Sequence, residues 1–141
     1  MANCSNWGSP GTNVPLPDLL STTGTLNCFM TGFTQTGNTI TVSVYASGGT
    51  TALGSITGGG NSGTLAAMST ATFSIAPSTQ YYAVVTAVGQ TPQVLYSYDS
   101  MSYGGTTFAG TCSLCVEDQP SGGDCDFNDA VVSISWTLNA G

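Results

Sequence analysis

The stretch DCDFNDAVVSISW, residues 124–136, places three carboxylates and one amide within six positions. Their hard oxygen atoms are ligands that favour calcium over zinc or copper. The chain has seven acidic residues and no Lys, Arg or His, so its formal net charge is −7. No basic side chain can neutralise this loop. The repulsion between its carboxylates can therefore be reduced in two ways: protonation of carboxylates whose pKa is raised, or a bound cation.

Five of the seven acids lie between residues 117 and 129, in EDQPSGGDCDFND. Such a charge run is ordinarily a solvated acidic turn. Here the spacing D-x-D-x-N-D favours a calcium site, because it projects alternate side chains toward one centre. The pattern opens like an EF-hand, but Asp129 stands where that loop needs Gly, and Ser135 where it needs Glu. With Glu117 and Asp118 upstream, the loop holds more anionic oxygens than one ion requires, which predicts two adjacent calcium ions.

The missing residue types exclude several classes of function. Nucleic-acid binding needs Lys or Arg contacts to phosphate, and an acidic surface repels anionic membranes. The absence of His, Lys and Arg excludes Ser-His-Asp and Cys-His catalysis, Schiff-base chemistry and a cationic phosphoryl clamp. No apolar run is long enough to span a membrane. Enzymes that use paired carboxylates, such as glycosidases, remain.

The five cysteines are an odd number, so at least one is free or pairs between chains; they are Cys4, Cys28, Cys112, Cys115 and Cys125. The Cys112-Ser-Leu-Cys115 spacing resembles a zinc or redox motif, but no second pair and no His complete it. We expect a local disulfide there, or two buried thiols. The N-terminus lacks the charged and apolar regions of a signal peptide, so either the protein is made without one or the sequence begins after it. Without one, we expect a soluble protein that is cytoplasmic or secreted by another route, and the localisation stays open.

Alternating residues predict an all-β fold in a single domain, residues 1–141, with residues 1–24 as an irregular lead-in. Strands are indicated in NTITVSVYA and, most clearly, in the last segment, where Val132 and Ile134 face one way. Residues 99–111 are polar and Gly-rich, and we expect at most one short strand in them. Only PLPDLL and a few residues near Ala66 hint at helix. The pattern predicts an antiparallel β-sandwich of roughly nine short strands.

The C-terminal residues resemble the bacterial two-calcium lectins that bind fucose and mannose. That family ends with E-D-G-x-D-x-D-[YF]-N-D, then an A-V-V strand, a Trp and a final Gly. The matching text here is Glu117-Asp118, then DCDFND, AVVSISW and Gly141. A weaker similarity lies in VPLPDLL and FTQTGNTITVSV. In that family two calcium ions lie side by side, and vicinal hydroxyls of one monosaccharide complete both coordination shells.

The resemblance implies a set of site residues. The calcium ligands would be Glu117, Asp124, Asp126, Asn128 and Asp129, with a backbone carbonyl near Thr34 and the C-terminal carboxylate of Gly141. Asp126 and Asp129 would bridge the two ions, and Gly141 would reach a neighbouring subunit, which implies a homodimer or a higher homo-oligomer. The sugar would contact Gln35, Thr36, Gly37, Glu117, Asp118, Asp124, Asp126 and Asp129, with Asp118 accepting a hydrogen bond.

The chain also departs from the family pattern. Three extra residues separate Glu117-Asp118 from Asp124, and the tail after Asp129 is two residues longer. The leading hypothesis is a calcium-dependent lectin for fucose- or mannose-bearing glycans, without catalytic activity. The second is a structural or adhesin module in which calcium only holds the loop. An acid-pair glycosidase ranks third, because its carboxylates would have to face one another across a cleft.

Overall fold

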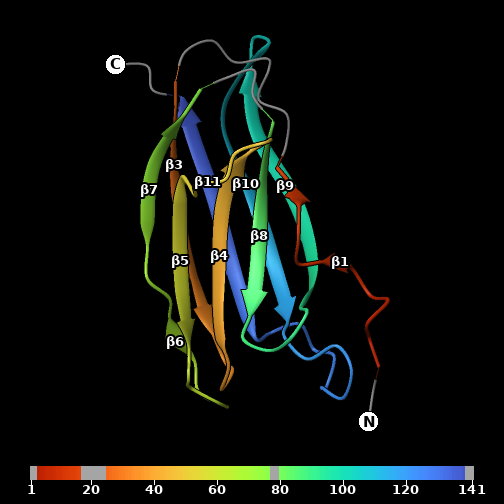
Figure 1. Ribbon diagram of the computed structural model, residues 1–141. Helices are drawn as coiled ribbons and strands as arrows, with labels where there is room; N and C mark the ends of the chain where they lie inside the picture. Colours follow the sequence, from red (N-terminus) through yellow and green to blue (C-terminus); the bar gives the residue numbers. More distant parts are fainter. Residues whose placement is uncertain (1–2, 17–24, 77–79, 139–141) are drawn as a thin grey trace.

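The computed structural model describes residues 3–16, 25–76 and 80–138, which form two antiparallel β-sheets packed face to face (Figure 1). The strands are β1 (Ser9–Pro10), β2 (Val14–Pro15), β3 (Leu26–Thr34), β4 (Thr39–Ala46), β5 (Gly54–Gly59), β6 (Ala66–Ala67), β7 (Ala71–Ile75), β8 (Tyr81–Ala87), β9 (Gln93–Tyr103), β10 (Thr106–Glu117) and β11 (Ala130–Leu138). The described residues contain no helix that could cross a membrane. The predicted all-β sandwich is confirmed, with more strands than expected.

The larger sheet has the order β1-β9-β10-β11-β3-β6, with β7 also paired to β3, and the smaller has the order β2-β8-β4-β5. Their inner faces form the core, because apolar residues alternate with small polar ones along each strand. In β11 the buried positions are Ala130, Val132, Ile134 and Trp136. The face predicted for the last strand is therefore the buried one.

The N-terminal segment contributes regular structure that its sequence did not suggest. Strand β1 pairs with β9 and strand β2 with β8, so the segment adds one short strand to each sheet. Each strand is only two residues long, too short for any periodicity to be visible in the sequence. Of the two helix hints, residues 17–20 of PLPDLL lie outside the described residues, and Ala66–Ala67 is a strand.

Residues 99–111 were expected to hold at most one short strand, and this was wrong. They belong to a long hairpin of β9 and β10, joined at Gly104 and Gly105, which both have positive φ. Two such glycines make the tight turn that matches strand twist. The prediction failed because the side chains of β9 beyond Tyr96 are exposed, so no buried apolar set marks the strand.

Candidate functional site

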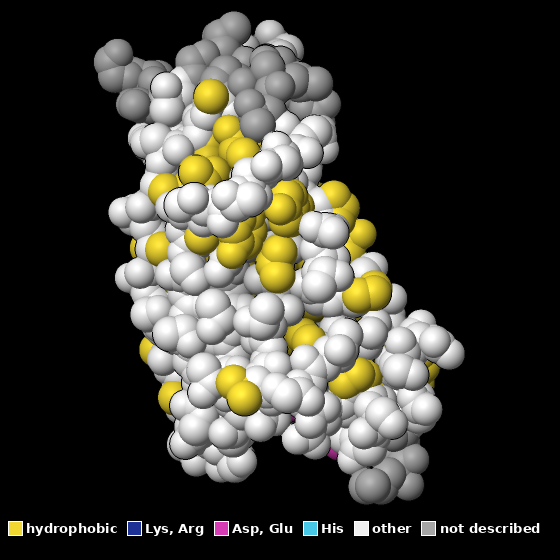
Figure 2. Space-filling model, in the orientation of Figure 1, with side chains coloured by type: hydrophobic (Ala, Val, Ile, Leu, Met, Phe, Trp, Pro, Cys, Tyr) yellow, Lys and Arg dark blue, Asp and Glu magenta, His cyan; other side chains and the backbone are white. Residues whose placement is uncertain are grey.

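The candidate site lies at one end of the sandwich, where three connections meet. The β3–β4, β5–β6 and β10–β11 connections together line a cavity of about 440 Å³. Its lining residues are Gln35, Thr36, Gly37, Asn38, Ser62, Glu117, Asp118, Gln119, Gly123, Asp124 and Asp129. In Figure 2, acidic side chains are visible only toward the lower end of the face shown, where Figure 1 has these connections.

Most of the predicted site residues line this cavity. They are Gln35, Thr36, Gly37, Glu117, Asp118, Asp124 and Asp129. Asp126 and Asn128 lie further along the same loop, and Thr34 is buried at the end of β3. Gly141 lies outside the described residues.

Glu117, the last residue of β10, is the most deeply buried acid, with 1% of its surface exposed. Its Oε1 accepts a hydrogen bond from the backbone N–H of Gln119 at 3.2 Å. Its Oε2 is buried and has no partner among the described residues. Burial, followed by the nearby charges of Asp124 and Asp118, raises the pKa of the Glu117 carboxyl. An unpartnered buried carboxylate oxygen is costly, so it requires a proton or a cation.

Carboxylate oxygens gather around Glu117 in two groups. One contains Glu117, Asp118 and Asp129, and the other contains Glu117, Asp124 and Asp126, with the oxygens of each group within 4.8 Å of one another. All of these ligand atoms are oxygens, the donor type that calcium uses. The residues present therefore fit calcium, and Glu117 is common to both positions.

Asp118 and Asp129 are held by hydrogen bonds around the cavity. Asp118 is 3% exposed, and its Oδ2 accepts hydrogen bonds from the Thr36 hydroxyl and, at 3.0 Å, from the Asn38 side-chain amide. Asp129 Oδ2 accepts the backbone N–H of Asp118 at 2.8 Å. Burial, followed by the charges of Asp118 and Glu117, raises the pKa of Asp129 to about 7. Near neutral pH, this carboxyl is therefore poised between the acid and the anion.

The exposed part of the loop carries its own internal contacts. Asn128 donates from its side-chain amide to Asp126 Oδ2 at 2.6 Å, and from its backbone N–H to Asp126 Oδ1 at 3.3 Å. The side-chain oxygen of Asn128 is not used in this contact and is free to act as an acceptor. Asp124 and Asp126 are both exposed, so their oxygens are accessible from solvent.

The β5–β6 connection enters the site through contacts that the sequence reasoning missed. Asn61 donates from its side-chain amide to the Thr34 carbonyl at 2.7 Å, and Thr34 Oγ1 donates to Asn61 Oδ1 at 2.9 Å. Ser62 follows, and a Cβ on Gly37 would lie 2.6 Å from its Oγ. Asn38 and Ser62 are therefore additional lining residues. The GGGNSG motif marked a loop, but its position beside the acidic loop follows only from the sheet topology.

Gly123 is required by the packing of the acidic loop. A Cβ there would lie 2.5 Å from Glu117 Oε1 and 2.4 Å from the Gln119 carbonyl oxygen. Both distances are shorter than non-bonded atoms tolerate, so any larger residue would displace the Glu117 carboxylate or the backbone. The glycine allows the loop to fold directly over the buried acid.

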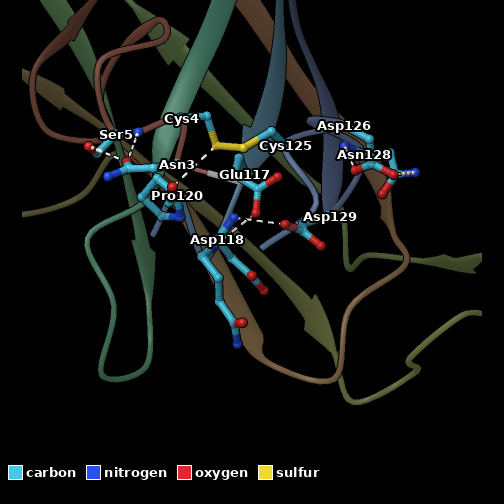
Figure 3. Close-up of a disulfide and its surroundings, with 11 residues drawn as sticks. Asn3, Cys4, Ser5, Glu117, Asp118, Pro120, Cys125, Asp126, Asn128 and Asp129 are labelled. Atoms are coloured by element: carbon cyan, nitrogen blue, oxygen red, sulfur yellow. Dashed lines mark hydrogen bonds between the residues drawn. A yellow bond between two sulfur atoms is a disulfide. The ribbon is translucent and has the colours of Figure 1, made fainter. Parts of the chain in front are cut away.

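Of the two alternatives predicted for Cys112 and Cys115, a local disulfide or two buried thiols, the local disulfide was wrong. Cys112 and Cys115 are both free, because residues three apart on a strand point to opposite faces of the sheet. Cys112 is fully buried, whereas Cys115 is only partly buried. The disulfide instead joins Cys4 to Cys125, 121 residues apart in sequence, and links the N-terminal segment to the acidic loop (Figure 3).

Comparison with known protein families gives one match, fucose-binding lectin II (PA-IIL), over residues 21–138. The chain belongs to this lectin family. The match contains all three connections that form the cavity, and the family is the one that the C-terminal residues predicted. A comparison with curated proteins found no match.

Solved structures of lectins share the fold of this family member. The C-terminal domain of the BC2L-C lectin from Burkholderia cenocepacia is 18% identical, with a TM-score of 0.61 over 82% of this chain and 96% of that one. The Chromobacterium violaceum lectin CV2L, solved with alpha-methyl-fucoside, is 18% identical, with a TM-score of 0.59 over 88% and 94%. The Ralstonia solanacearum high-affinity mannose-binding lectin is 20% identical, with a TM-score of 0.56 over 83% and 98%.

Proposed function

We propose that this protein is a calcium-dependent lectin without catalytic activity. Two calcium ions would be held by the β10–β11 connection, and one fucose- or mannose-type monosaccharide would bind over them through vicinal hydroxyls. Membership of a lectin family supports sugar binding. Two lectins of the same fold, one solved with alpha-methyl-fucoside and one that binds mannose, support the sugar class.

One observation carries the metal part of the proposal: the buried, unpartnered Oε2 of Glu117. No Lys, Arg or His exists anywhere in the chain to pair with it. The same carboxylate belongs to both oxygen groups, so one cation on each side of it would neutralise several acids at once. A pair of metal ions would thus neutralise the crowded carboxylates and give the unpartnered Glu117 Oε2 a partner.

The side chains would hold the two ions and contact the sugar in distinct groups. Glu117, Asp124 and Asp126 would hold one ion, and Glu117, Asp118 and Asp129 the other, with the Asn128 oxygen available to the first group. When bound, the ions would supply an electrophilic surface that two adjacent sugar hydroxyls coordinate. Gln35, Thr36 and Gly37 line the same cavity from the β3–β4 connection and would set sugar preference. The roles of Thr34 and Gly141 remain predictions from the resemblance.

The test is retention on fucose- and mannose-bearing beads with calcium, with EDTA, and after calcium is restored. We expect binding in calcium, release by EDTA and full recovery, because without the ions the sugar hydroxyls would lose the cations that they coordinate and the carboxylates would repel one another. Galactose-bearing beads are the control for non-specific retention. Retention that persists in EDTA would contradict the proposal.

A second candidate function, a calcium-stabilised structural module, is favoured by the state of Asp118. Its carboxylate is almost fully buried and already accepts hydrogen bonds from Thr36 and Asn38, so it offers little to a sugar. Residues 119–123, a segment three residues longer than in the family pattern, also contribute Gln119 and Gly123 to the cavity wall. This alternative predicts a large loss of melting temperature on chelation but no signal on a calcium-replete glycan array.

A further inference from the structure

We propose that the Cys4–Cys125 disulfide is a positioning element of the calcium site, which makes the N-terminal segment part of the metal-binding apparatus. This inference rests on the proposed function, since it concerns how the same loop is held. Cys125 lies between Asp124 and Asp126, two of the acids in the second oxygen group. Whatever fixes Cys125 therefore fixes the backbone that carries both carboxylates.

The backbone of this loop adopts a conformation that its residues do not favour on their own. Cys125 has φ of 62° and Phe127 has φ of 55°, both in the left-handed region that side chains other than Gly rarely adopt. Such positions persist when the surrounding structure over-determines them. Phe127 is held by burial of its ring, and Cys125 is held by its covalent bond to Cys4. Asp124 and Asp126 thus lie beside a covalent anchor.

The N-terminal segment, at the other end of the disulfide, is itself held in place by backbone contacts. Cys4 is fully buried, and its backbone N–H donates to the Pro120 carbonyl at 2.8 Å. Asn3 forms a β-bridge with Ser121, within the residues inserted between Asp118 and Asp124. Further along, β1 pairs with β9. The segment is therefore anchored both to the acidic loop and to the sheet, and the disulfide transmits that anchorage to the ligands (Figure 3).

The free cysteines point to the same role for this bond. Cys28 and Cys112 are buried thiols on the strands, where burial raises the pKa of each to about 12 and leaves them unreactive. The chain thus places its disulfide at the acidic loop and leaves the thiols of its core strands unpaired. A bond that served only to fasten the sheets together would join strands, whereas this one joins the N-terminal segment to the loop that carries the oxygen groups.

The test is calcium affinity measured by isothermal titration with calcium alone at 25 °C. Cys4→Ser/Cys125→Ser should bind calcium roughly 10–100-fold more weakly, the usual effect of losing a group that orients metal ligands. Ile75→Ala is the matched control, because it opens a buried site at the other end of the sandwich, where Ile75 pairs with Leu26 and Leu26 with Leu138. That variant should lose stability and keep wild-type calcium affinity. Equal calcium affinity of the double variant and wild type would overturn the proposal that the disulfide positions the calcium ligands.

A second arm covers the case in which the double variant does not fold. Folded wild-type protein is reduced with a phosphine: the S–S bond breaks, water supplies the two thiol protons, and the phosphine is oxidised to its oxide by taking up the oxygen of that water. The reduced protein should keep its β-sheet circular dichroism and bind calcium more weakly. Global unfolding on reduction, or unchanged affinity, would contradict a positioning role. If wild-type protein binds calcium but no sugar, only the lectin proposal fails; if it binds no calcium, both fail.

Discussion

The two ends of strand β10 carry connections of opposite character. At Thr106 the strand begins after a turn of two glycines, and the hairpin there exposes apolar side chains such as Tyr103, which is 84% exposed. At Glu117 it runs into the acidic loop, which contains buried carboxylates, two left-handed non-glycine residues and a disulfide. Both connections close antiparallel pairs, and the short turn is sufficient for that purpose. The additional chemistry of the acidic loop therefore points to ligand binding.

The comparison also separates two uses of acidic residues. Asp99, on the hairpin, is exposed and accepts a hydrogen bond from the backbone N–H of Ser100 at 2.9 Å. Glu117 is buried against other acids and leaves one oxygen unpaired. An exposed acid is solvated at little cost, whereas a buried one needs a counter-charge. The predictions below therefore contrast changes in the acidic loop with changes in the β9–β10 hairpin.

The largest expected effect is that of Glu117→Gln. The substitution removes the carboxylate common to both oxygen groups, so calcium affinity should fall by at least roughly a hundredfold, beyond the 10–100-fold typical of residues that only support a ligand. In EDTA the variant should melt no lower than wild type, because one buried like charge has been removed. Isothermal titration with calcium and thermal melts measure both quantities.

Asp99→Asn is the matched control for Glu117→Gln, because it removes one exposed negative charge from β9, opposite Thr111 and away from the acidic loop. Its calcium affinity and melting temperature should equal those of wild type. Equal losses in the two variants would show that overall charge, and not the local arrangement of Glu117, determines calcium binding.

An intermediate effect is expected from adding a methyl group at a glycine. Gly123→Ala would place a Cβ 2.5 Å from Glu117 Oε1, so the carboxylate must shift, and calcium binding should weaken by roughly tenfold. Gly104→Ala, in the hairpin turn, meets no atom within 4 Å but has φ of 61°. It should cost about 1 kcal/mol of folding stability and leave calcium affinity unchanged. Reversal of this pattern in titrations and melts would refute the role of Gly123.

The stability of the calcium-free protein should also depend on pH. Because the pKa of Asp129 is raised from 3.8 to about 7 in the folded state, the folded chain binds more protons than the unfolded chain between these values. The free energy of unfolding in EDTA should therefore fall as the pH rises from about 4 to 7. In excess calcium the trend should reverse, because binding requires ionised ligands.

Thermal melts across this pH range, with and without calcium, measure the effect. Asp129→Asn should flatten the slope in EDTA, whereas Asp99→Asn should leave it intact. If the stability of the calcium-free protein rose with pH over the same range, this would contradict the view that these acids are buried and repel one another.

The sequence predicted best what is encoded locally. Alternation in the last strand identified its buried face, including Ile134 and Trp136, because one side of the sheet covers the core. The high density of acids, in a chain without any basic residue, identified the acidic loop as a candidate site. In the structure, this loop and the β3–β4 connection line the same cavity. These features depend only on neighbouring residues and on composition.

What the sequence left open depends on contacts between distant segments. Five cysteines allow many pairings, and the link from Cys4 to Cys125 follows only once the N-terminal segment lies along residues 119–123. The entry of Asn61 and Ser62 into the site depends on how β5 and β6 end. The hairpin of β9 and β10 was missed because exposed strands carry no apolar pattern. Each of these results from tertiary structure, which one-dimensional patterns do not record.

Native mass spectrometry of the wild-type protein, titrated with calcium and then with methyl α-mannoside or methyl α-fucoside, tests the central claim most directly. The account predicts a shift by two calcium ions per chain, followed by one sugar that adds only to the calcium-loaded species. A chain that takes up no calcium, or a sugar that adds equally well to the metal-free chain, would contradict it.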